Sequence, residues 1–120
     1  MGKDQSRSRP EYKKMTIAVD LDGTLAEYNG WEGNNIIGAP VPAMFFRVQR
    51  WIEEGEEVVI FTARADCIEA MVPIRRWLIY HGLGDLRITN IKEKGFQEIY
   101  DDRAFRVERN TGCIEETDWG

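Results

Sequence analysis

The sequence predicts an α/β protein with a single Rossmann-like, three-layer domain built on a mostly parallel sheet. The length of 120 residues suits one compact domain and is too short for two. Short β-branched, apolar runs alternate along the chain with segments whose apolar residues recur at helical spacing. The apolar runs lack polar alternation, which is typical of parallel strands covered on both faces. Strands that alternate with helices also favour right-handed crossovers.

The first half of the chain predicts two strands, a long loop and a helix. A first strand is expected at residues 15 to 20 (MTIAVD), just before an Asp-Gly turn. Residues 26 to 39 are rich in Gly and Asn and predict a long loop, and loops of this length are more often functional than idle. Apolar residues at helical spacing predict a helix over residues 41 to 54, and residues 57 to 62 (EVVIFT) predict a second buried strand.

The second half predicts a helix followed by two strands. The helix is expected at residues 66 to 80, with Asp66 and Glu69 spaced as a capping box. Pro73 indicates either a kink in this helix or a later start, because proline suits a first helical turn and disrupts an interior. Residues 86 to 91 (LRITNI) and 96 to 100 (FQEIY) predict the last two strands.

Composition predicts a protein of the cytoplasm with no membrane partner. Apolar residues make up 42% of the chain, with four Trp and five Phe to build a core. No apolar run approaches the roughly 18 residues that a membrane span needs, and no secretory signal is visible. Cys67 and Cys113 form no CxxC pair and are too few for a disulfide scaffold, which favours a reducing compartment.

Charge divides the chain into a basic head and an acidic body. Residues 1 to 14 carry five basic and two acidic side chains and predict a flexible basic N-terminal arm. Such an arm can contact nucleic acid or an acidic partner, although a solvated terminus is the simpler interpretation. The acidic remainder is a poor general platform for polyanions.

Polar side chains suited to chemistry follow the predicted strands. Ligands of open parallel sheets bind at the carboxyl ends of the strands. The residues expected there are Asp20, Asp22, Thr62, Ala63, Arg64, Lys92, Asp101 and Asp102. Converging carboxylates repel one another unless a cation lies between them, and a set of oxygen ligands suits Mg²⁺. One carboxylate is then free to attack phosphorus and another to move protons, while a hydroxyl and an ammonium hold the phosphoryl oxygens.

The sequence DLDGT at 20 to 24, Thr62, Lys92 and the Asp pair at 101 to 102 resembles the four motifs of the haloacid dehalogenase-like (HAD) phosphohydrolase superfamily. The likeness extends from residue 15 to about residue 110, so residues 15 to 120 are expected to form a HAD-like phosphatase domain. The gaps at 25 to 57 and 63 to 91 are too short for an inserted cap domain, so a capless member with an open site is expected.

The resemblance implies a role for each site residue. Asp20 is the expected nucleophile, which forms an aspartyl-phosphate, and Asp22 is the expected general acid and base. Thr62 and Lys92 are expected to bind the phosphoryl oxygens, with Ala63 and Arg64 beside them, and Lys94 is the alternative lysine. For Arg64 the position at the strand end indicates either a contact with the substrate phosphate or an ion pair with a nearby Asp or Glu. The expected Mg²⁺ ligands are a carboxylate oxygen of Asp20, the backbone carbonyl of Asp22, and Asp101, with Asp102 acting directly or through water.

The expected function is Mg²⁺-dependent hydrolysis of a phosphomonoester, with a phosphorylated small molecule or a nucleotide as substrate. One alternative is a phosphatase of nucleic-acid 3′-ends or nucleotides, because DDRA at 101 to 104 resembles the phosphatase domains of polynucleotide kinases. Another is a non-catalytic metal-binding or receiver-like module, although receivers place their acidic pair early and this chain places it last. An oligomer is possible, since a partner subunit can close an open site. Tyr28 and Trp31 can either stack on a base or sugar, or anchor the long loop.

Overall fold

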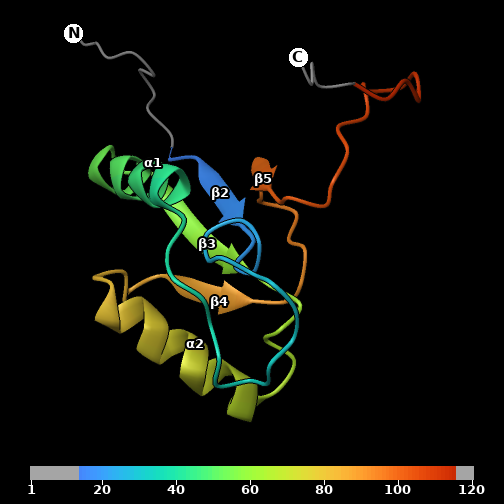
Figure 1. Cartoon of the computed structure of the whole chain (residues 1–120). Helices are drawn as coiled ribbons and strands as arrows, with labels where there is room; N and C mark the ends of the chain where they lie inside the picture. The colour runs from blue at the N-terminus through green and yellow to red at the C-terminus, as the bar shows by residue number, and fades with distance from the viewer. Residues whose placement is uncertain (1–13, 116–120) are drawn as a thin grey trace, which may run out of the picture.

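Four parallel strands form one sheet in the order β4-β3-β2-β5. The computed structural model describes residues 14 to 115 (Figure 1). The strands are β2 (Thr16–Val19), β3 (Glu57–Phe61), β4 (Arg87–Thr89) and β5 (Glu98–Tyr100). The predicted small, Rossmann-like α/β domain with a parallel sheet is confirmed. Because β2 lies between β3 and β5, the carboxyl end of β2 is flanked by theirs.

Helix α1 (Pro42–Glu53) connects β2 to β3 and matches the predicted helix to within one residue at each end. Pro42 occupies the first turn, where its fixed φ suits a helix and its missing N–H has no partner to lose. The helix ends at Glu53, and Gly55, two residues later, has a φ of 87° that allows the backbone to turn away.

Helix α2 (Ile68–Tyr80) connects β3 to β4 and corrects two expectations. Its N-cap is Cys67, with no side-chain cap hydrogen bond, so the predicted capping box is wrong. Asp66 lies one residue outside the cap, where it cannot form the reciprocal bonds of that motif. The helix begins five residues before Pro73, so the later start is also wrong. The buried proline ring contributes to the core at the position where the helix loses one hydrogen bond.

One buried cluster lies between the sheet and both helices. Its members include Ile17, Val19, Val58, Ile60 and Ile88 from the strands and Met44, Val48, Ile74 and Leu78 from the helices. The strand residues pair in register, Ile17 with Val58 and Val19 with Ile60, so their side chains share one face of the sheet. Both helices therefore cover the same face.

The other face of the sheet holds Ala18 and Val59, both fully buried, and an edge-to-face contact between Phe61 and Phe96. No helix within residues 14 to 115 covers it, so two layers are described where three were expected. The chain steps in one direction from β2 to β3 to β4, and crossovers of one hand then place both helices on one side. The return from β4 to β5 is made without a helix.

The last two strands are shorter than predicted, with three residues each. The chain leaves β4 after Thr89, and β5 ends at Tyr100, directly before the Asp pair. No helix in the described range is both long and apolar enough to cross a bilayer. The predicted basic arm, apart from Lys14, lies outside the described residues.

Candidate functional site

Three aspartates meet at the carboxyl edge of the sheet. One carboxylate oxygen from each of Asp20, Asp101 and Asp102 lies within 4.8 Å of the others. Asp20 follows β2 and the pair follows β5, and the two strands are hydrogen-bonded neighbours. The backbone N–H of Asp20 donates to the carbonyl of Tyr100 at 2.9 Å, which aligns the two strand ends. Parallel pairing therefore brings together carboxylates that lie about 80 positions apart in the chain.

The cluster carries an electrostatic cost that a cation would remove. Burial and the nearby charge of Asp101 raise the pKa of Asp20 to about 7. Asp101 is half-buried and Asp102 is exposed, so the cluster faces solvent on one side. Three carboxylate oxygens at this spacing are hard ligands with an open side for water, so the residues fit Mg²⁺.

The turn after β2 is shaped to accept the Asp pair. Gly23 has a φ of 89°, and a Cβ at this position would lie 2.6 Å from Oδ2 of Asp102. The hydroxyl of Thr24 donates to Oδ1 of Asp102 at 2.9 Å and accepts from the backbone N–H of Asp102 at 2.9 Å. Leu21, fully buried, anchors the turn through its carbonyl. Thr24 thus links the two acidic motifs, a contact that sequence reasoning missed although the residue belongs to the quoted motif.

Asp22 does not point its carboxylate into the cluster. Its two oxygens accept hydrogen bonds from Arg64, Nε to Oδ2 at 2.9 Å and Nη2 to Oδ1 at 2.7 Å. The side chain of Asp22 is 19% exposed and that of Arg64 is 3% exposed, so the ion pair is largely shielded from water. The expected metal contact of Asp22 involved its backbone carbonyl, and its side chain lines the same cleft as Asp20.

Thr62, which follows β3, is buried beside Asp22. Its hydroxyl oxygen accepts the backbone N–H of Arg64 at 3.2 Å, which leaves the hydroxyl proton free to be donated. Its own backbone N–H donates to the carbonyl of Thr89 at 2.9 Å, so the end of β3 is held by β4. A neutral donor therefore lies in the same cleft as the carboxylates.

The end of β4 brings Asn90, and not one of the two candidate lysines, to the cleft. Lys92 and Lys94 are both exposed, and neither lines the cavities that contain Asp20, whereas Asn90 does. The reason is the early end of β4, which makes Asn90 the first residue beyond the strand. Arg103 also lines the cleft and was missed. Its position directly after the Asp pair was the available signal.

The cleft consists of two adjoining cavities of about 410 and 340 Å³ that share Asp20, Ala63 and Arg103. The larger contains Asp101 and Asn90, and the smaller is also lined by Asp22, Thr62, Arg64, Tyr28, Trp31 and Asp102. Tyr28 is 46% and Trp31 is 58% exposed, so about half of each side chain is open to solvent.

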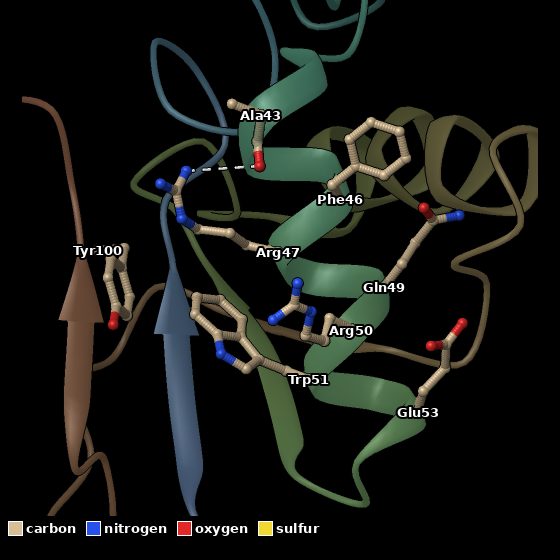
Figure 2. Close-up of a pocket in the computed structure, with 8 residues that line it drawn as sticks. All are labelled: Ala43, Phe46, Arg47, Gln49, Arg50, Trp51, Glu53 and Tyr100. Carbon is tan, nitrogen blue, oxygen red and sulfur yellow. Dashed lines mark hydrogen bonds between the residues drawn. The ribbon is translucent and has the colours of Figure 1, made fainter.

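A larger cavity, about 800 Å³, lies elsewhere, between α1 and β5 (Figure 2). Figure 2 shows the ring of Trp51 turned toward Tyr100, with the ring centroids 5.0 Å apart. Arg47 and Arg50 also line it, but none of the predicted site residues does. The clustered carboxylates line the other cleft.

Fold and site together define a class: a small Rossmann-like α/β domain with three aspartates at the carboxyl edge of its parallel sheet. No family model matches the chain, and no curated protein matches it. The solved structure of a conserved protein from Bacteroides thetaiotaomicron is similar, with 25% identity and a TM-score of 0.58 over 77% of this chain and 78% of that one. This likeness supports the α/β fold, and the description of that protein names no activity.

Proposed function

We propose that this protein is a Mg²⁺-dependent phosphomonoester hydrolase of HAD type that works through an aspartyl-phosphate. The observation that carries the proposal is the gathering of Asp20, Asp101 and Asp102 within 4.8 Å, in a cleft that Asp22 and Thr62 also line. This set contains a nucleophile, a proton carrier, a hydrogen-bond donor for the phosphoryl oxygens, and oxygen ligands for a cation. The order of the motifs in the sequence supports the same assignment.

Asp20 attacks the phosphorus atom of the ester in the first step. Its carboxylate oxygen forms the new P–O bond while the bond to the leaving group breaks, and Asp22, which enters the step protonated, gives its proton to the leaving-group oxygen. In the second step Asp22 takes a proton from water, which attacks the phosphorus atom. The acyl-phosphate bond then breaks, releasing inorganic phosphate and restoring the carboxylate of Asp20.

The remaining residues hold the phosphoryl group and the metal. Carboxylate oxygens of Asp20, Asp101 and Asp102, with the carbonyl of Asp22, are the groups that would hold Mg²⁺. When bound, the ion neutralises charge on the carboxylates and on the phosphoryl oxygens. The hydroxyl of Thr62 donates to a phosphoryl oxygen. Lys92, two residues beyond the cleft-lining Asn90, is the proposed ammonium contact on the basis of the motif order.

Phosphorylated nucleotides and nucleic-acid 3′-ends are the second candidate substrates. The exposed rings of Tyr28 and Trp31 at the smaller cavity favour them, since a base can stack on such a ring.

The proposal is tested with p-nitrophenyl phosphate and Mg²⁺. We expect multiple turnovers by the wild type, reversible loss on chelation, and a loss of roughly a thousandfold or more in kcat for Asp20→Asn, because the nucleophile is removed. Asp85→Asn is the matched control, since Asp85 is exposed and lies before β4, at the opposite end of the strands. Full activity in Asp20→Asn would refute the nucleophile assignment. Binding of Mg²⁺ without turnover of any phosphate ester would favour the non-catalytic module.

A further inference from the structure

Arg64 has every N–H of its guanidinium engaged. Nε donates to Oδ2 of Asp22 at 2.9 Å, and Nη2 donates to Oδ1 of Asp22 at 2.7 Å and to the carbonyl of Ile36 at 3.1 Å. Nη1 donates to the carbonyls of Gly33 at 3.4 Å and Asn34 at 3.1 Å. A guanidinium has five N–H donors, and these contacts use all five. None is left for a phosphoryl oxygen.

The surroundings of Arg64 also argue against a direct contact with substrate. The side chain is only 3% exposed. The Trp31 ring centroid lies 4.7 Å from the central carbon of the guanidinium, within the range of a cation–π interaction. Reaching a phosphate would require this buried cation to give up at least one of its contacts with Asp22 or the loop carbonyls.

We propose, on the basis of the function proposed above, that Arg64 is a positioning residue. It orients Asp22 for proton transfer and fastens the loop between β2 and α1 to the active site. Of the two alternatives that the sequence left open, this is the ion pair with a carboxylate and not the contact with the substrate phosphate.

The geometry of the pair explains how Arg64 would act on Asp22. Two parallel N–H···O bonds fix the plane of the carboxylate, which a single bond cannot do. Each Asp22 oxygen accepts one bond from Nε or Nη2 and so keeps another lone-pair position for a leaving group or a water. A proton donor held in one orientation avoids the loss, about a hundredfold, that a misplacement of about 1 Å can cause.

The loop contacts give Arg64 a second role in the same site. The carbonyls of Gly33, Asn34 and Ile36 converge on a side chain that lies about 30 positions later in the chain. They hold the segment that carries Trp31 beside the cleft. One side chain thus couples the position of the loop to the position of the proton carrier.

The test compares leaving groups in the Mg²⁺-loaded full chain. For Arg64→Lys and Arg64→Ala we expect kcat/KM to fall about a hundredfold with an alkyl phosphate such as glycerol 2-phosphate, because its alkoxide needs the proton of Asp22. With p-nitrophenyl phosphate, whose leaving group needs little protonation, we expect a loss of less than about fivefold. The inhibition constant of inorganic phosphate should stay within about twofold of wild type, since no phosphate contact is removed.

Arg75→Lys is the control for a merely structural arginine. Arg75 donates to the carbonyls of Gly84 and Leu86, between α2 and β4, so its loss should lower the melting temperature without changing the ratio between the two substrates. Equal losses of kcat/KM on both substrates, together with an inhibition constant of phosphate at least tenfold higher than in the wild type, would overturn the proposal. Those results would identify Arg64 as a phosphate ligand. An unchanged substrate ratio in a folded Arg64→Lys would also overturn it. Inactive wild-type protein would instead refute the proposed function.

Discussion

Asp20 and the Asp pair are held together by small, specific contacts. Gly23 leaves room for the carboxylate of Asp102, and Thr24 binds both the side chain and the backbone of Asp102. The main-chain bond from Asp20 to Tyr100 keeps the two strand ends level. The distance between the carboxylates thus depends on a glycine and a threonine as well as on the aspartates.

Gly23→Ala should damage the protein in two ways. The φ of 89° strains any residue with a Cβ, by about 1–3 kcal/mol of folding free energy, and the added carbon would push Asp102 out of place. We expect a lower free energy of unfolding in urea and at least tenfold weaker Mg²⁺ binding by titration calorimetry, roughly the cost of losing one contact that orients a metal ligand.

Gly82→Ala is the matched control for Gly23→Ala. Its φ is 79° and nothing lies within 4 Å of the added Cβ, so it should lose stability while Mg²⁺ binding stays as in the wild type. If the two variants bind Mg²⁺ equally well, the packing of Gly23 against Asp102 has no role in the metal site.

The loop between β2 and α1 contributes residues to the cleft as well as connecting two elements. It borders the cleft, it is bound by Arg64, and it leaves two aromatic rings about half exposed, Tyr28 and Trp31. The sequence left open whether these rings anchor the loop or stack on a ligand. The contact of Trp31 with Arg64 provides anchoring on one side, while its exposure leaves area for a ligand.

Trp31→Ala should raise KM for a nucleoside monophosphate about tenfold, the effect of losing one stacked base, and should change KM for glycerol 2-phosphate much less. Trp31→Phe should keep KM for the nucleoside monophosphate close to the wild-type value, because it retains a flat ring. Tyr80→Ala removes a ring that is 84% exposed on α2, outside the cleft, and should leave both KM values unchanged. Equal increases for both substrates with Trp31→Ala would mean that the ring only supports the loop.

The whole domain is arranged so that the edge of its sheet concentrates negative charge. Asp20 lies at the end of β2, one of the two inner strands, and Asp101 lies next to it, at the end of β5. Burial and this neighbour raise the pKa of Asp20 from 3.8 to about 7. The folded state therefore favours the protonated form of Asp20, so the stability linked to this group is present at low pH and is lost as pH rises toward 7.

In EDTA, the free energy of unfolding of the wild type relative to Asp20→Asn should fall between pH 5 and pH 8. The comparison removes the titration of Asp20 together with its coupling to Asp101 and Asp102, while titrating groups outside the cluster are common to both proteins. Mg²⁺ should reverse the trend, since a bound cation stabilises the ionised form. Urea denaturation at both pH values measures the effect. A wild type that gains stability over Asp20→Asn between pH 5 and pH 8 without metal would contradict the assigned electrostatics.

The local pattern was sufficient to predict the parallel strands, helix α1 and the residues at most strand ends. Strand propensity and turn signals are properties of neighbouring residues, and parallel pairing then requires that Asp20 and Asp101 share one edge. Three features followed only from the three-dimensional structure: the choice of Asp22 as the partner of Arg64, the presence of Asn90 and not Lys92 in the lining of the cleft, and the placement of both helices on one face. Each depends on the path of a loop or on where long-range pairing stops. Such features are decided by contacts between distant segments, which no short stretch of sequence contains.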